Sequence, residues 1–173
     1  GSDKPNNCAV LVNPTGDVRR AGKLHPFSFA HEDEHYAFAN EIHTWSVGGL
    51  RITPLVCYDL RFPEPFRLAA DATDAYVVIA NWPERRRAHW QTLLRARAIE
   101  NQAFVLGVNR VGDGDGLHYT GDSAIVSPWG ETLAGAAEQE AVLLADLDPA
   151  AITAARAAFP ALRDRRAGAY RLA

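Results

Sequence analysis

The chain has 173 residues, of which 18 are basic and 21 acidic, a formal net charge of −3, and 47% hydrophobic residues. This composition is typical of a globular protein, and the mild negative charge gives no electrostatic basis for binding nucleic acid or an anionic membrane. No apolar run approaches the ~20 residues of a membrane helix, no secretory pattern opens the sequence, and two cysteines make no disulfide framework. We therefore expect a reducing, cytoplasmic setting with neither nucleic acid nor a membrane as partner.

The first half of the chain is predicted to form two hairpins, a helix and a buried strand. Their ranges are 8–12 with 18–22, 42–47 with 50–56, 64–72, and 75–80. Between the hairpins, residues 24–40 show no steady period and predict a loop. Pro63 and Pro65 mark the start of the helix, because proline is tolerated in a first helical turn.

The second half is predicted to begin and end with a helix and to hold four strands between them. The ranges are 86–101, 103–108, 123–126, 131–136, 141–146 and 149–159. Residues 112–116 predict a loop, and 160–173 a charged tail. Because strands and amphipathic helices interleave without a linker or repeat, the sequence predicts one layered α/β domain over residues 1–173.

Cys57 is the first candidate for chemistry, because it stands where the apolar strand 50–56 stops. A helix N-terminus after that strand would favour a thiolate and could hold an oxyanion. The alternative is a buried structural cysteine, and Cys8, inside an apolar strand, keeps that interpretation. The charged stretch CYDLRFPEPFR favours a reactive thiol at Cys57.

Other charged residues are predicted to serve the structure. Arg97, Glu100 and Asn101 interrupt an apolar helix face, and we expect a buried ion pair with a helix cap. Asp59 and Arg61 are expected to pair with each other or with a nearby acid, Glu64.

An ordered series of short motifs resembles the carbon–nitrogen hydrolase (nitrilase) superfamily. In family order they are GKLHPF (22–27), LVCYDLRFP (55–63), ANWP (80–83), ARAIENQ (96–102), NRVG (109–112), GDS (121–123) and SPWG (127–130). Each motif is weak alone, but the ordered set is specific and covers almost the whole chain. The resemblance is nearest to the omega-amidase branch, enzymes that remove the terminal amide of 2-oxoglutaramate and similar dicarboxylate monoamides.

The resemblance implies a role for each matching residue. Cys57 would be the nucleophile, and Lys23 with the backbone N–H of Tyr58 would stabilise the oxyanion. The family's second glutamate would be Glu32, with Glu34 as the alternative. These roles agree with the chemistry of the side chains. An acid keeps a neighbouring lysine charged, and the charged lysine stabilises a negative charge that develops beside it. The plain alternatives are a solvated lysine at a hairpin end and solvated loop acids.

The substrate pocket is less determined by the sequence. Trp82 follows a strand end, where such sites form, and is expected to line the pocket; the alternative is a core tryptophan. A dicarboxylate monoamide needs a partner for its distal carboxylate. Arg85, Arg86 and Arg87 are available, and no spacing selects one.

The resemblance also implies an α-β-β-α sandwich that this sequence enters about a third of the way along. The family's general base is a glutamate upstream of the lysine, and no glutamate precedes Lys23 here. We therefore expect an incomplete sheet with open edges near Cys8 and Ala75, and no amide turnover by this chain alone. No metal or organic cofactor is implied, and a homodimer paired partly through the C-terminal tail is expected.

Three alternatives to an omega-amidase stay open. The chain could resemble a carbamoyl amidohydrolase, a nitrilase proper, or a silent homologue that serves as a binding or dimerising module. A papain-like protease would need a downstream His and Asn set, and His89 and His118 carry no such signature.

Overall fold

The computed structural model describes residues 3–166 and 168–169. The strands are β1 (Cys8–Val12), β2 (Val18–Gly22), β3 (Trp45–Val47), β4 (Leu50–Val56), β5 (Ala75–Ala80), β6 (Phe104–Asn109), β7 (Val111–Gly114), β8 (Leu117–Val126) and β9 (Thr132–Ala137). The helices are α1 (Glu32–His35), α2 (Pro63–Ala69), α3 (Arg87–Asn101) and α4 (Pro149–Ala158). Short 3-10 helices are η1 (Ser28–Ala30), η2 (Cys57–Arg61), η3 (Ala70–Ala72) and η4 (Glu84–Arg86). Residues 167 and 170–173 of the predicted tail lie outside the described residues.

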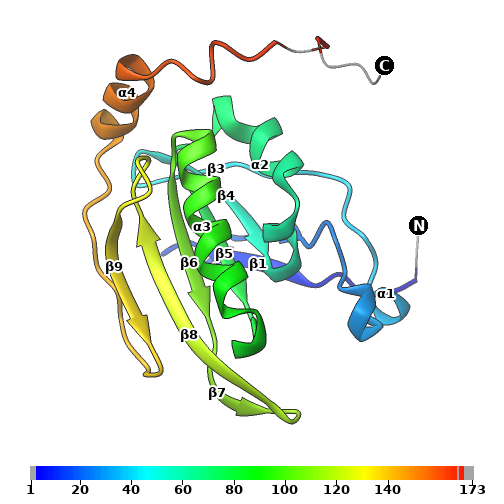
Figure 1. The fold of residues 1–173 in the computed structure, drawn as a ribbon. Helices are drawn as coiled ribbons and strands as arrows, with labels where there is room; N and C mark the ends of the chain where they lie inside the picture. The colour runs from blue at the N-terminus through cyan, green and yellow to red at the C-terminus, as the bar shows by residue number, and fades with distance from the viewer. Residues whose placement is uncertain (1–2, 167, 170–173) are drawn as a thin grey trace.

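A seven-stranded mixed sheet organises the fold (Figure 1). Its order is β3-β4-β5-β6-β8-β7, with β9 also paired to β8. The three central strands β4, β5 and β6 run parallel, whereas the outer pairings are antiparallel. The parallel strands read as continuous apolar runs because both of their faces meet other groups.

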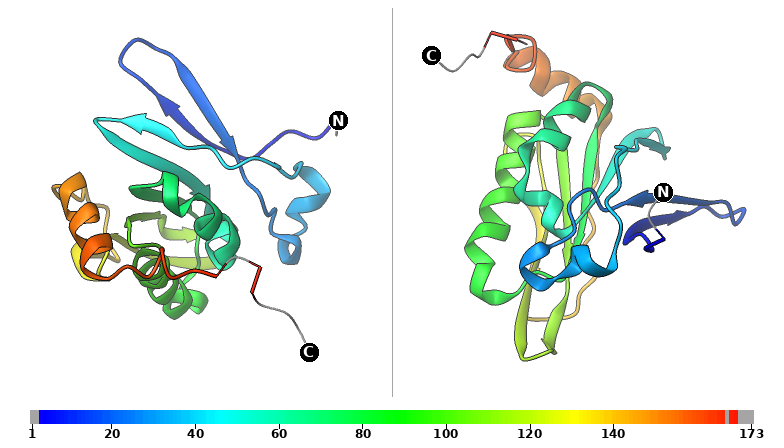
Figure 2. Two further views of the ribbon diagram at one scale, coloured as in Figure 1. Left: turned by 90° about the horizontal axis from the view of Figure 1, so that it is seen from above. Right: turned by 90° about the vertical axis from the view of Figure 1, so that its right-hand side faces the viewer.

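Helices α2 and α3 cover one face of this sheet, and the separate hairpin β1–β2 lies on the other side (Figure 2). The main core forms between sheet and helices, where Tyr76, Val78 and Val105 pack with Trp90 and Leu94. Gly107 is required there, since a Cβ would lie 2.5 Å from a methyl group of Leu94. The α/β class is thus confirmed, and three layers of the expected sandwich are present: helices, large sheet and small sheet. Among the described residues no outer helical layer covers the hairpin.

The region between the hairpins differs from its prediction. Residues 24–40 hold η1 and the one-turn helix α1, so they are not wholly irregular. Strand β3 covers only the end of the predicted range 42–47. The expected helix N-terminus beside Cys57 is also wrong in detail, because the 3-10 helix η2 begins at Cys57 itself and α2 starts only at Pro63.

The C-terminal half holds two further corrections. The predicted loop 112–116 is a hairpin, in which β7 pairs with the long strand β8. The predicted strand 141–146 forms no strand, and Val142 and Leu144 are exposed. The open edge expected near Ala75 is also wrong, since β5 is hydrogen-bonded on both sides by β4 and β6.

Candidate active site

Cys57 occupies a strained backbone position at the end of β4. Its φ is +48°, in the left-handed region that residues other than glycine seldom adopt. Such positions persist only where the surroundings enforce them, and they gather at functional sites. The thiol is partly buried and donates toward the carbonyl of Asn81, with Sγ 3.9 Å from that oxygen. The N–H of Tyr58, in the first turn of η2, has no acceptor within that helix, because the first N–H groups of any helix lack one.

Lys23 and Glu32 form a partly buried ion pair with Nζ and Oε2 2.5 Å apart. Lys23 follows the last residue of β2, and Glu32 begins α1. The same carboxylate accepts hydrogen bonds from the side chain of Asn7 at 2.9 Å and the N–H of Phe27 at 2.7 Å. The alternative acid, Glu34, is exposed and pairs with His31 instead. Glu32 is therefore the acid that contacts the lysine.

The charge state of this pair follows from its contacts. Burial raises the pKa of Glu32, but the hydrogen bonds from Lys23, Asn7 and Phe27 together bring it below its usual value. The carboxylate thus stays ionised beside the ammonium group. The Lys23 ammonium is in turn buried next to the pocket, so its field acts with little solvent screening.

One open cavity brings these residues together. It has a volume of about 590 Å³ and is lined by Lys23, Glu32 and Cys57 with the carboxyl ends of β5 and β6. Among the described residues that line it, Glu32 is the one carboxylate. Ligands of parallel sheets bind beyond these strand ends, so the cavity is where a substrate is expected.

Burial raises the pKa of the Cys57 thiol most strongly. The Lys23 charge and a backbone hydrogen bond at Asn81 lower this pKa, and the charges of Glu32 and Asp59 raise it again. The net direction is upward. A thiol in this state is protonated at neutral pH and needs a base before it becomes a nucleophile.

Asp59 is fully buried and joins two motifs. It accepts hydrogen bonds from the N–H and the ring Nδ1 of His25, each at 2.9 Å, and from the N–H of Val56 at 3.0 Å. The predicted pairing of Asp59 and Arg61 with each other or with Glu64 is therefore wrong, because the Arg61 guanidinium contacts His89 instead. The structural role of Asp59 is as expected. Sequence reasoning missed His25, whose place directly after Lys23 and Leu24 was the available signal.

A second, smaller hollow of about 40 Å³ shares the Cys57 thiol with the main cavity. Tyr58, Trp82, Arg61 and Arg86 contribute to its wall. Trp82 fits both of its predicted descriptions, since its indole is buried against Trp90 yet borders this hollow.

Arg97 serves the structure as predicted. It pairs with Glu100 at 2.9 Å, and Asn101 donates to the Arg97 carbonyl. The guanidinium also donates to the carbonyl of Leu60, which lies in η2. Helix α3 thereby holds the turn that carries Cys57.

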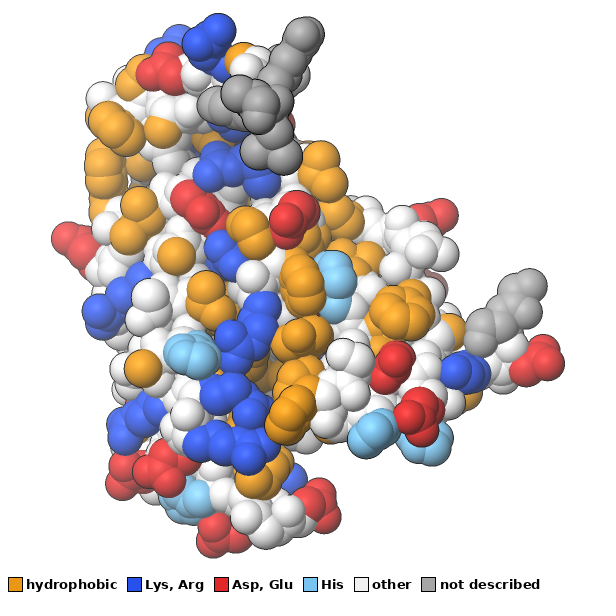
Figure 3. All heavy atoms as spheres, turned by 45° about the vertical axis from the view of Figure 1, so that its right-hand side comes forward, with side chains coloured by type: hydrophobic (Ala, Val, Ile, Leu, Met, Phe, Trp, Pro, Cys, Tyr) orange, Lys and Arg blue, Asp and Glu red, His pale blue; other side chains and the backbone are white. Residues whose placement is uncertain are grey.

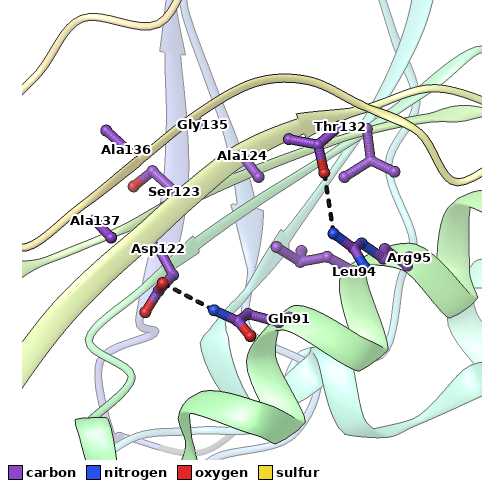
Figure 4. A pocket seen from close by; sticks show the side chains of 11 residues that line it. Gln91, Leu94, Arg95, Asp122, Ser123, Ala124, Thr132, Gly135, Ala136 and Ala137 are labelled. Carbon is purple, nitrogen blue, oxygen red and sulfur yellow. Dashed lines mark hydrogen bonds between the residues drawn. The ribbon is translucent and has the colours of Figure 1, made fainter.

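A cavity of about 320 Å³ between α3 and strands β8 and β9 lies apart from the thiol (Figure 4). In it Gln91 donates to Asp122, and Arg95 donates to Thr132. Within the described part of the chain, no cluster of histidine, cysteine or acidic residues is arranged to hold a metal ion. No helix there is long and apolar enough to cross a membrane.

Known proteins resemble this chain in sequence. Omega-amidase YafV of Escherichia coli K12 is 48% identical over 160 residues, which are 91% of this chain and 62% of that protein. The 2-oxoglutaramate amidase of Paenarthrobacter nicotinovorans is 42% identical over 168 residues, 93% of this chain and 57% of that protein. The chain thus spans about 60% of the length of these curated relatives.

A solved structure and a family model agree with these relatives. The structure of XC1258 from Xanthomonas campestris, a CN-hydrolase superfamily protein with an arsenic adduct in its active site, has a TM-score of 0.88 and 40% identity, covering 97% of this chain and 66% of that one. The model of the carbon-nitrogen hydrolase family matches residues 1–157. The chain therefore belongs to the carbon-nitrogen hydrolase family.

Proposed function

We propose that this chain carries the nucleophile and the oxyanion-stabilising groups of an omega-amidase site. Such a site hydrolyses the terminal amide of a dicarboxylate monoamide such as 2-oxoglutaramate. The observation that carries the proposal is the shared cavity of Cys57, Lys23 and Glu32. The names of the relatives support the substrate class.

In the proposed mechanism, the Cys57 thiolate attacks the amide carbonyl carbon and the C=O electron pair moves onto oxygen. Lys23 and the N–H of Tyr58 stabilise that oxyanion. The intermediate collapses when the C–N bond breaks, and the nitrogen leaves as ammonia after the general base gives it the proton taken from the Cys57 thiol. Water then attacks the thioester, the C–S bond breaks, and the carboxylic acid and the free thiol are released.

A general base must supply the thiolate, because burial raises the pKa of Cys57. Glu32 is committed to Lys23, Asn7 and Phe27. We propose that the base is a glutamate upstream of these residues in the active enzyme. The 173-residue chain alone is then expected to release no ammonia.

The test is ammonia release from 2-oxoglutaramate by this chain and by a version extended upstream, each compared with its Cys57→Ala variant. Release by the extended version alone supports both the site and the upstream base. Release by the 173-residue chain that is lost in Cys57→Ala supports the site but refutes the upstream base. If neither releases ammonia, a substrate panel follows, in which carbon dioxide with ammonia identifies a carbamoyl substrate and turnover of a nitrile identifies a nitrilase.

A silent homologue is the second candidate, and the single carboxylate lining the main cavity favours it. Alkylation separates the two. In the version extended upstream, a catalytic Cys57 reacts with iodoacetamide faster than Cys8 does, whereas two equally slow thiols in that version favour a binding module.

We also propose one domain over residues 1–173 and a homodimer in the cytoplasm. Leu68, Ile99 and Phe159 are all more than half exposed around a cavity of about 970 Å³ next to the C-terminal segment. Apolar patches of this kind mark interaction sites. We expect the parent chain to sediment as a dimer and the Leu68→Glu variant to sediment as a monomer. A monomeric parent chain refutes the pairing.

A further inference from the structure

The small hollow beside Cys57 is bordered by two guanidinium groups that have no acidic partner among the described residues. The Arg61 guanidinium contacts the Nδ1 of His89 at 3.1 Å and lies 4.8 Å from the centre of the Trp82 ring. The Arg86 guanidinium lies 5.4 Å from the centre of the Phe27 ring and makes no hydrogen bond with a described residue. Figure 3 shows Lys and Arg side chains gathered beside hydrophobic ones on this face of the molecule.

The neighbouring arginines are occupied elsewhere or stand away from the thiol. Arg87 is held by the carboxylates of Asp122 and Glu138. Arg85 is exposed and is not among the residues that border the hollow. Of the three arginines that the sequence left undecided, Arg86 alone borders a cavity shared with Cys57.

The main cavity and the small hollow suit the two ends of one substrate, its amide and its distal carboxylate. The main cavity holds Lys23 beside the thiol, where an amide carbonyl would react. The small hollow, about 40 Å³, exceeds the ~10–15 Å³ that one water needs and suits one compact group rather than a whole substrate. A carboxylate is that size, and a planar guanidinium binds it through two parallel hydrogen bonds.

Resting on the proposed function, we propose that Arg86, assisted by Arg61, binds the distal carboxylate of the substrate and so selects dicarboxylate monoamides over neutral amides. Stacking on Phe27 holds the guanidinium in place at the thiol. Burial and the charges of Arg85 and Arg61 lower the pKa of Arg86, the direction expected of a cation that lacks a counter-ion. The substrate carboxylate supplies that counter-ion.

Protection of Cys57 from iodoacetamide tests this without requiring turnover. The chain is titrated with 2-oxoglutaramate or with butyramide, and alkylation of Cys57 is followed by mass spectrometry with Cys8 as internal reference. In Arg86→Gln the concentration of 2-oxoglutaramate that protects is expected to rise about ten- to a hundredfold, as for loss of a charge-assisted hydrogen bond, with butyramide unaffected. The matched control Arg85→Gln removes the same charge one residue away and should leave both curves unchanged.

The outcomes separate the two proposals. Protection by 2-oxoglutaramate that is equal in the parent chain and Arg86→Gln overturns the carboxylate role while leaving the site intact. An equal loss of protection in Arg85→Gln also overturns the carboxylate role, because a general effect of net charge then explains the loss. If, in the version extended upstream, Cys57 reacts no faster than Cys8 and no ligand protects it, the proposed function itself fails. Partial recovery in Arg86→Lys supports a charge effect, because lysine keeps the charge but loses the planar fork.

Discussion

The carboxylate of Asp59 binds both the backbone N–H and the ring of His25, a residue 34 positions earlier in the chain. The His25 ring also stacks on Phe62, with ring centroids 3.8 Å apart. Asp59 lies two residues after Cys57, and His25 two residues after Lys23. One buried acid therefore fixes the distance between the lysine and the thiol.

Asp59→Ala is expected to destabilise the fold by about 3 kcal/mol, because it leaves buried N–H groups without acceptors. It should also slow the alkylation of Cys57, because the Lys23 charge that lowers the pKa of the thiol is no longer held beside it, and this loss outweighs the smaller pKa-raising effect of the Asp59 charge. Urea denaturation and the iodoacetamide rate check these expectations. Glu64→Ala removes an exposed acid from α2 and serves as the control; an equal effect there contradicts the assigned role of Asp59.

Glu32→Gln is expected to lower stability at neutral pH and to make little difference in acid. The folded pKa of Glu32 lies below its unfolded value, so its ionised form stabilises the fold above the unfolded pKa of ~4.3. That contribution is lost as the pH falls through the folded pKa. Urea midpoints of the parent chain and the variant should therefore differ at pH 7 and converge towards pH 3. A gap that stays constant over this range would falsify the linkage.

Lys23→Met is expected to shift the alkylation profile of Cys57 towards higher pH by about one unit. The ammonium lowers the pKa of the thiol, and without it burial and the Glu32 charge are opposed only by the backbone hydrogen bond at Asn81. Initial rates with iodoacetamide between pH 6 and pH 10 give the profile. Arg20→Met, on the exposed part of strand β2, which Lys23 follows, is the matched control, and a shift of the same size there means that net charge alone is responsible.

Gly107→Ala is expected to destabilise the fold by about 1–3 kcal/mol through overpacking. The new methyl would meet Leu94 at 2.5 Å and Trp90 at 2.9 Å, both of them buried on α3. Gly135→Ala, in β9, meets its nearest neighbour at 3.4 Å and should change stability far less. Thermal unfolding of both variants tests this prediction. Equal melting temperatures of Gly107→Ala and Gly135→Ala would show that α3 moves to accommodate the extra methyl group.

Local patterns in the sequence predicted the elements that position the thiol. The apolar run of β4, the break after Val56 and the helical period of α3 each follow from short-range chemistry. The β7–β8 hairpin also had a local signal, the Asp115-Gly116 pair, which is typical of a tight hairpin turn. Both residues have the positive φ that such a turn requires. The predicted strand at 141–146 failed because its alternation finds no partner strand in the described chain.

Long-range contacts were not accessible in this way. No spacing indicates that Asp59 binds His25 rather than Arg61, since the pairing depends on how two strands from different sheets meet. Lys23 and Glu32 were matched only through a resemblance, because a loop of unknown course separates them. The proposal of Arg86 over its neighbours needed the positions that η4 and the start of α3 give to the three arginine side chains.

Within the described part of the chain, the small sheet β1–β2 pairs with no further strand, so polar contacts such as those of Asp59 and His25 help tie Lys23 to the large sheet. Sub-global opening of such a unit requires less free energy than unfolding of the whole chain. Mild denaturant should therefore separate the lysine from the thiol while the seven-stranded sheet persists. Amide hydrogens of β2 would then exchange before those of β5. The arrangement of Lys23 beside Cys57 would be lost at a lower denaturant concentration than the one that unfolds the large sheet.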